Sequence, residues 1–173
     1  MSCPAGLSQR LFPFLYLVWY TGYEYAATGR KKEFRIRYEN KIGIVGCGFL
    51  GNIVADAWKK GLLPDYELVG VTSRTRASAE KTAANVGCSV CEDMDALLAL
   101  EPEYIVEAAS VESVRAMAIP ALKRGVNLVI LSIGAFADLD FYAQVKAAAV
   151  EGGARCTWPA VPSAALTCCK LSP

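Results

Sequence analysis

The chain has 173 residues, a hydrophobic fraction of 54% and a formal net charge of +1. This length is enough to bury the core of one domain, and the near-neutral charge gives no reason to expect nucleic acid as a partner. The sequence contains no histidine, which excludes histidine acid–base catalysis and histidine-ligated metal sites within these residues.

The first forty residues do not share the pattern of the rest of the chain. The apolar run Leu11–Tyr20 is interrupted by Pro13 and is too short to span a bilayer, so we expect no membrane association. The alternating segment Phe34–Tyr38 is typical of an edge strand. We expect residues 1–40 to form an N-terminal extension that is poorly ordered and has no function in the fold.

From Lys41 onward, apolar runs of strand length alternate with helical segments. The predicted strands are 41–45, 66–72, 89–91, 104–108 and 127–131, and the predicted helices are 49–60, 77–86, 94–100, 113–124 and 139–151. This alternation is typical of an α/β fold with a doubly wound parallel sheet. We therefore assign residues 41–155 to a Rossmann domain that binds NAD or NADP.

The segment Lys41–Gly51 (KIGIVGCGFLG) places a glycine motif between a strand and a helix, which is the context that a dinucleotide fingerprint requires. The first glycine allows the tight turn, the second lets a pyrophosphate approach the backbone, and the third lets the helix pack close to the strand. The helix N-terminus presents free N–H groups to the phosphates. The alternative is a glycine-rich turn in an unrelated α/β fold. The predicted cofactor contacts are Gly46, Gly48, Phe49, Leu50 and Gly51.

The end of the second strand lacks the acidic residue that selects NAD. Residues 72–76 read TSRTR, and two arginines with neighbouring hydroxyls suit a 2′-phosphate. We predict that Ser73 and Arg74 bind this phosphate and that the cofactor is NADP, or either dinucleotide. The alternative is an ordinary polar loop.

The fourth and fifth strands end in EAAS and LSIG. An open α/β sheet binds its ligand at the carboxyl ends of its strands, and small residues there leave room for a cofactor. We predict cofactor contacts at Ala108, Ala109, Ser110 and Ser132; the alternative is plain loop chemistry.

The seven cysteines are an odd number, which in a chain of this class indicates reduced thiols and a cytoplasmic location. Cys88 and Cys91 form a single CxxC pair, which is compatible with a redox pair or with half of a zinc site. Burial of two small side chains on a short strand explains the pair more simply, so we predict no metal site.

Three segments in this order, KIGIVGCGFLGN, YIVEAAS and LVILSIGAFAD, resemble the L-aspartate dehydrogenase family over about residues 41–155. The resemblance implies an N-terminal Rossmann domain, a C-terminal α+β domain and a homodimer. It also implies oxidation of aspartate to iminoaspartate with NAD or NADP, which leads to oxaloacetate or feeds NAD biosynthesis. Matched by position, Gly46, Gly48 and Gly51 fall on the phosphate loop, Ala108, Ala109 and Ser110 on the strand-four cofactor edge, and Ser132 and Ala135 on the strand-five edge near the nicotinamide.

Residues 156–173 do not match the family, which continues with a strand, an SGAIGG turn and a second domain that carries the catalytic histidine. Permitted codons for this tail, read one base out of frame, encode VHVA followed by SGAIGG. We therefore expect an irregular, out-of-frame tail, a truncated domain without its sixth strand, and no second domain.

The expected function is the NAD(P)-binding part of an L-aspartate dehydrogenase. No catalytic residue is assigned within the chain, which is expected to be inactive by itself and to bind aspartate only if the missing domain is present. The alternatives are a non-catalytic nucleotide-binding module and the Rossmann half of a sugar- or dihydrodipicolinate-type NADP-dependent reductase.

Overall fold

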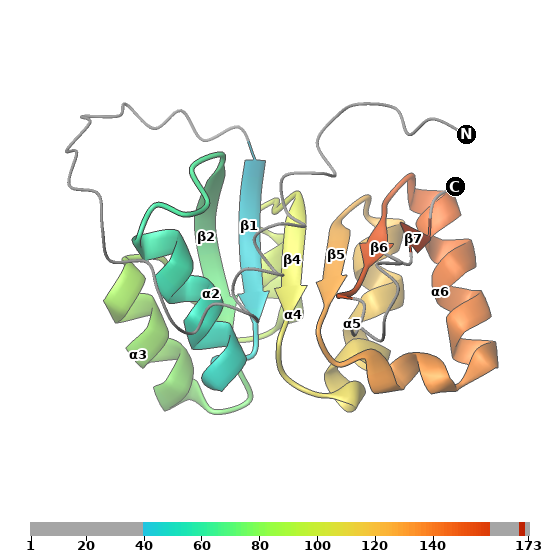
Figure 1. Cartoon of the computed structure of the whole chain (residues 1–173), viewed down its shortest axis with the longest axis horizontal. Helices are drawn as coiled ribbons and strands as arrows, with labels where there is room; N and C mark the ends of the chain where they lie inside the picture. Colours follow the sequence, from blue (N-terminus) through green and yellow to red (C-terminus); the bar gives the residue numbers. More distant parts are fainter. Residues whose placement is uncertain (1–39, 160–169, 172–173) are drawn as a thin grey trace, which may run out of the picture.

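The computed structural model describes residues 40–159 and the backbone of residues 170–171, and these form one sheet with helices on both faces (Figure 1). The strand order is β3-β2-β1-β4-β5-β6-β7. All the strand pairs are parallel except β6 with β7. The predicted doubly wound parallel sheet is thus confirmed.

The observed elements follow the predicted ones closely. The strands are β1 (Asn40–Val45), β2 (Tyr66–Thr72), β3 (Ser89–Cys91), β4 (Tyr104–Glu107), β5 (Asn127–Ile130), β6 (Cys156–Thr157) and β7 (Lys170–Leu171). The helices are α2 (Phe49–Lys59), α3 (Arg76–Val86), α4 (Met94–Leu98), α5 (Val111–Lys123), the 3₁₀ helix η1 (Ile133–Ala137) and α6 (Leu139–Gly152). The helix η1 was not predicted.

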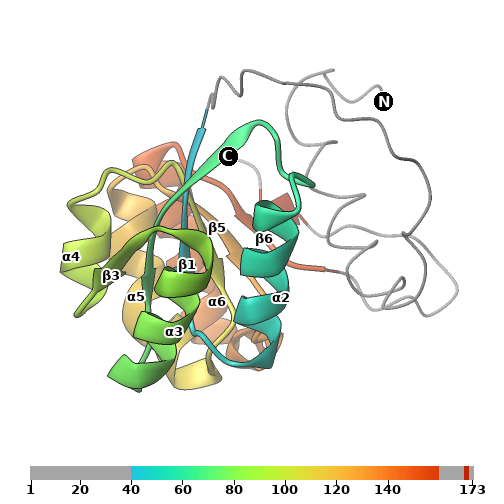
Figure 2. The same cartoon turned by 90° about the vertical axis from the view of Figure 1, so that its left-hand side faces the viewer.

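The helices form two layers, with α2 and α3 over one face of the sheet and α4, α5 and α6 over the other (Figure 2). Side chains of a strand point alternately to the two faces. In β4, Ile105 therefore joins the core beneath α4, α5 and α6, whereas Val106 joins the core beneath α2 and α3. Burial on both faces explains why this strand is apolar at every central position.

Two helices begin at an aspartate whose side chain accepts hydrogen bonds from N–H groups of the first turn. The carboxylate of Asp93 accepts a hydrogen bond from the Ala96 N–H at 2.8 Å, so it caps α4. Asp138 caps α6 in the same way. Such caps satisfy N–H groups that the first turn leaves free. At the other end, α3 stops at Gly87, whose φ of +79° suits glycine.

The expected loss of the sixth strand is wrong. β6 pairs with β5 in parallel, with Cys156 opposite Leu128 and Thr157 opposite Val129. The side chain of Cys156 is fully buried, and the Thr157 hydroxyl donates to the Leu128 carbonyl at 3.1 Å. The sheet therefore continues beyond the predicted domain boundary at Arg155. Of the expected extension over residues 1–40, residues 1–39 lie outside the described residues, and Asn40 is the first residue of β1. Most of the expected irregular tail (residues 160–169 and 172–173) also lies outside them.

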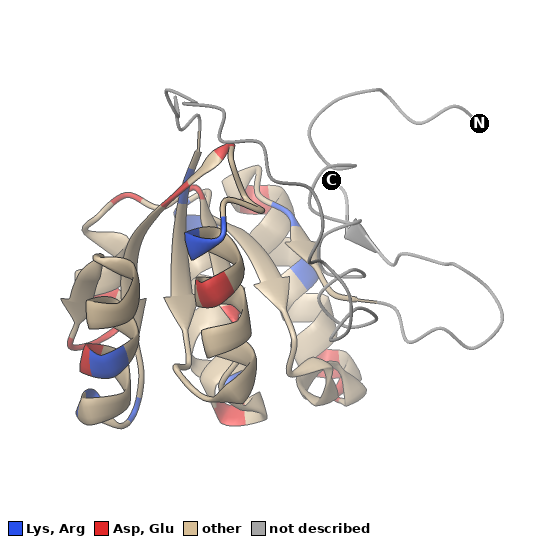
Figure 3. Ribbon diagram, turned by 60° about the vertical axis from the view of Figure 1, so that its left-hand side comes forward, with Lys and Arg blue, Asp and Glu red and all other residues tan. Residues whose placement is uncertain are grey.

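Acidic and basic residues are interspersed along the described part of the chain, on helices and on loops (Figure 3). This distribution agrees with the net charge of +1. Within the described part of the chain, no helix combines the length and the apolar character that crossing a bilayer requires.

Candidate dinucleotide-binding site

The glycine loop joins β1 to α2 at the carboxyl end of the sheet. β1 lies between β2 and β4, where the strand order changes direction, and this is the crevice in which open α/β sheets bind ligands. Gly46 begins the loop with a φ of +98°. A Cβ atom there would lie 2.7 Å from the carbonyl carbon and oxygen of Ala108, so both the turn and the neighbouring loop after β4 require glycine.

Gly48 and Gly51 serve two different purposes in this loop. A Cβ atom at Gly48 would have no neighbour within 4 Å, so the space in front of this residue is open. A Cβ atom at Gly51 would lie 1.8 Å from the Gly46 carbonyl oxygen, so the helix packs directly on the turn. These are the roles that the fingerprint assigns to the second and third glycines.

The predicted contacts Phe49 and Leu50 form the start of α2. Both residues are exposed, and the first turn of the helix carries no acidic residue. The free N–H groups of this turn and its positive dipole end therefore face the open space at Gly48 without a competing negative charge.

Asn52, in the first turn of α2, is a site residue that the sequence reasoning missed. Its side-chain amide donates to the carbonyl oxygens of Cys47 at 3.1 Å and Gly48 at 2.8 Å. Its oxygen accepts from the Thr82 hydroxyl at 2.9 Å, which links the loop to α3. The signal that was available is an amide side chain directly after the glycine motif.

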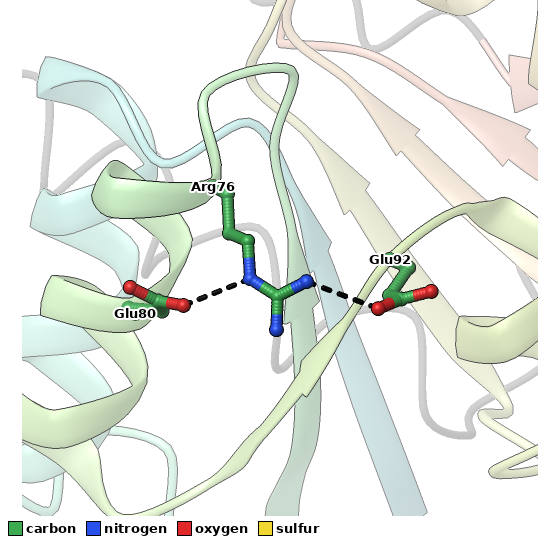
Figure 4. Close-up of polar contacts among 3 residues, drawn as sticks. All are labelled: Arg76, Glu80 and Glu92. Carbon is green, nitrogen blue, oxygen red and sulfur yellow. Dashed lines mark hydrogen bonds and ion pairs between the residues drawn. The ribbon is translucent and has the colours of Figure 1, made fainter.

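The two arginines after β2 have different surroundings. Arg76 donates from Nε to Glu80 at 2.9 Å and from Nη1 to Glu92 at 3.0 Å (Figure 4). Arg74 is exposed, and no ion pair joins it to another residue within 40–159. The structure therefore leaves Arg74, with half-buried Ser73 beside it, outside the described ion pairs at this end of the site, although its charge helps to lower the pKa of the Glu112 carboxyl.

A buried carboxylate joins the loops that follow β4 and β5. Glu107 is fully buried, and its Oε1 accepts from the N–H groups of Ala109 at 2.8 Å and Ser110 at 2.9 Å. The Ser132 N–H donates to Oε2 at 3.1 Å, and the Ser132 hydroxyl donates to Oε1 at 3.0 Å. The sequence reasoning assigned no role to this side chain.

The predicted contacts on these two loops are brought together at the same edge of the sheet. Ala109 is exposed, while Ala108, Ser110 and Ser132 are half-buried. Ala135 differs, because its side chain is fully buried in the core formed with α5 and α6. Any contact between Ala135 and a cofactor would therefore be made by its backbone.

The thiols of the described residues are free and largely buried. Burial raises the pKa of the Cys47 thiol, which lies in the glycine loop, and a hydrogen bond with Thr82 opposes this effect. Burial also raises the pKa of Cys88 to about 11 and raises the pKa of Cys91. Because a thiolate is the reactive form, these surroundings favour inert thiols at neutral pH. Residues 40–159 contain no cluster of three or more His, Cys, Asp or Glu side chains that could hold a metal ion.

The site fits a nicotinamide dinucleotide. The open space at Gly48 and the first turn of α2 suit a pyrophosphate. The end of β2 would face the adenosine ribose, and the loops after β4 and β5 would face the nicotinamide half.

Comparison with known proteins supports this interpretation. A family model described as "Homoserine dehydrogenase, NAD binding domain" matches residues 46–159. The chain is also similar to the WlbA dehydrogenase from Bordetella pertussis, solved in complex with NADH and UDP-GlcNAcA. That match has a TM-score of 0.63 and 20% identity and covers 70% of this chain and 37% of that protein, which shows the shared fold.

Curated relatives confirm the resemblance noted in the sequence. L-Aspartate dehydrogenase from Methanococcus maripaludis strain C5 is 34% identical over 102 residues, which cover 59% of this chain and 38% of the relative. L-Aspartate dehydrogenase 2 from Bordetella bronchiseptica is 33% identical over 123 residues, which cover 70% of this chain and 45% of the relative. The chain thus spans less than half the length of these relatives.

Proposed function

The chain belongs to the family of homoserine dehydrogenase NAD-binding domains, and on that premise we propose that it is the dinucleotide-binding half of an NAD(P)-dependent L-aspartate dehydrogenase. The reaction would oxidise aspartate to iminoaspartate, which leads to oxaloacetate and ammonia. The observation that carries the proposal is the glycine loop, which is open at Gly48 and tightly packed at Gly51, in a chain whose curated relatives include several L-aspartate dehydrogenases.

Each part of the proposed site has its own task. The backbone of Gly48, Phe49 and Leu50 would bind the pyrophosphate, and the neighbouring Asn52 fixes the loop carbonyls. Ser73 and Arg74 would bind the 2′-phosphate of NADP. The loops after β4 and β5 would orient the nicotinamide. The bound cofactor would supply the acceptor for the hydride that aspartate loses.

We expect the 173-residue polypeptide to bind the dinucleotide without oxidising aspartate, because it contains no histidine to exchange a proton with the substrate. A role in NAD biosynthesis, a cytoplasmic location and a homodimer belong to the same proposal. They are supported by the similarity to L-aspartate dehydrogenases.

The test has two readouts on the purified chain. Titration with NADH and NADPH, followed by nicotinamide fluorescence, measures binding, and aspartate-dependent formation of NADPH measures turnover. Binding of neither cofactor would contradict the proposed function. Turnover of a sugar or a dihydrodipicolinate-type substrate, but not of aspartate, would favour a different reductase.

We also propose that residues 156–173 are an out-of-frame version of the family sequence. The support is the sequence pattern, since permitted codons for these residues, read with a shift of one base, encode the SGAIGG turn. The nucleotide sequence at the Arg155 codon tests the proposal, and a shifted frame without a glycine-rich turn would contradict it.

A further inference from the structure

We propose that Glu107 is a positioning residue that holds the loops after β4 and β5 in the arrangement needed by the nicotinamide half of the cofactor. This inference rests on the proposed function, because it assigns a task within the same site. Glu107 is fully buried, so it acts through the loops and not by contact with the ligand.

The hydrogen bonds of Glu107 explain how one side chain can fix two loops. Three of its donors are backbone N–H groups, two from the loop after β4 and one from the loop after β5, and the fourth is the Ser132 hydroxyl. Ser110 is also the N-cap of α5. The carboxylate therefore binds at the start of a helix and at the end of the next strand at the same time.

The charge of Glu107 has no partner of opposite sign among the described ion pairs of residues 40–159. Burial of a carboxylate is costly unless hydrogen bonds replace its water shell. The four donors provide this replacement, and a carboxylate can accept from all of them because it carries no proton of its own. A neutral amide at this position would place its N–H₂ group against one or more of these donors.

The opposite end of the same strands shows that connecting them does not require a charge. There the Asn127 amide donates to the Glu103 carbonyl at 3.0 Å and accepts from the Arg155 N–H at 3.0 Å. A neutral side chain thus joins β4, β5 and the start of β6 at their amino ends. Of these two side chains that connect β4 with β5, Asn127 at the amino ends is neutral and Glu107 at the ligand-binding ends is a carboxylate. This difference points to a role of Glu107 in the site.

The position of Glu107 also links the nicotinamide side to the glycine loop. A Cβ atom at Gly46 would lie 2.7 Å from the Ala108 carbonyl and 2.7 Å from the Ala109 side chain. Ala109, whose N–H group donates to Glu107, is therefore also one of the two residues that pack against the first glycine. Because the adenosine half lies towards β2, the other half of the dinucleotide must extend over β4 and β5.

The experiment compares two probes, NADH and ADP-ribose, which lacks the nicotinamide. For wild type we expect NADH to bind more tightly than ADP-ribose. For Glu107→Gln we expect NADH binding to weaken by about tenfold or more, as for loss of hydrogen bonds to a charged group, and ADP-ribose binding to change much less. Nicotinamide fluorescence in the bound state should fall in the same variant.

Two further variants separate positioning from general stability. Ser132→Ala removes one donor to the carboxylate and should weaken NADH binding in the same selective way. It provides the test if Glu107→Gln does not fold. Asn127→Ala is the matched control, because it removes hydrogen bonds between the same strands at the far end of the sheet. It should lower the melting temperature and leave the binding ratio of NADH to ADP-ribose unchanged.

The outcomes distinguish the two proposals. Wild type that binds neither probe would contradict the proposed function and this inference with it. A second outcome is that wild type binds NADH and that the folded Glu107→Gln and Ser132→Ala variants keep its ratio of NADH affinity to ADP-ribose affinity. This outcome would overturn only the role of Glu107. An equal loss of both probes in these variants would also overturn it.

Discussion

The Gly46 carbonyl oxygen occupies the place that a side chain at Gly51 would need, since a Cβ atom at residue 51 would lie 1.8 Å from it. We therefore expect Gly51→Ala to force the first turn of α2 away from the loop. Because the obstacle is backbone and cannot rotate aside, the free energy of unfolding should fall by about 3 kcal/mol or more, which corresponds to a drop of roughly 6–12 °C in melting temperature. Thermal unfolding measures this, and an unchanged melting temperature would contradict it.

Gly48→Ala should weaken cofactor binding without lowering the melting temperature. Its backbone conformation, with φ −81°, is open to alanine, and a Cβ atom there has no neighbour within 4 Å. We expect Gly48→Ala to keep the melting temperature of wild type and to weaken NADH binding by about tenfold to a hundredfold, because the pyrophosphate can no longer reach the N–H groups of α2. Tight NADH binding by a folded Gly48→Ala variant would show that the phosphates lie elsewhere.

Arg74 should decide how the site distinguishes NADP from NAD. We expect Arg74→Ala to cost about 1.5–3 kcal/mol in NADPH binding, as for a hydrogen bond to a charged group, and to leave NADH binding nearly unchanged. Arg76→Ala is the control and should have a smaller effect, because Arg76 is already paired with Glu80 and Glu92 (Figure 4). Titration of both cofactors against each variant measures this. A strong preference of wild type for NAD, or no effect of Arg74→Ala, would contradict the assignment.

The stability of the fold should decrease in alkaline solution because of Cys156. Burial raises the pKa of this thiol from 9.0 to about 12 in the folded chain. The folded state therefore keeps a proton that the unfolded state loses. The contribution of the buried thiol to the free energy of unfolding is complete below about pH 9 and disappears as the pH rises towards 12. In reducing buffer, the free energy of unfolding of Cys156→Ala should fall less steeply than that of wild type between pH 9 and 11. Parallel pH profiles would indicate that the thiol is solvated.

The sequence predicted most of the fold because its signals are local. β2 and β3 have the predicted bounds, since β2 is a run rich in valine and threonine and β3 is a short segment between the end of one helix and the N-cap of the next. The helix η1 was missed because five residues in a 3₁₀ turn have no distinct periodicity. β6 was missed because Pro159 and Pro162 made the tail a poor candidate, yet the strand ends at Thr157, before the prolines.

The sequence predicted the part of the candidate site that a local motif forms. It did not predict the contacts between residues that are far apart in the chain. The glycine loop has a spacing that shows in the sequence. The pairing of Arg76 with Glu92 and the bond from Ser132 to Glu107 join residues far apart in the chain. Their partners depend on which strand ends become neighbours in the sheet, and no local pattern gives that information.

The central place of β1 in the sheet has a consequence for how the polypeptide acquires its fold. β1 pairs with β2, which is the next strand in the sequence, but its other neighbour is β4, where Ile42 lies opposite Tyr104. That pairing closes a long loop, and such non-local contacts form slowly. Until Tyr104 has left the ribosome, one edge of an apolar strand stays open to other chains. The strand that carries the glycine loop is therefore also a segment through which the nascent chain can associate with other chains.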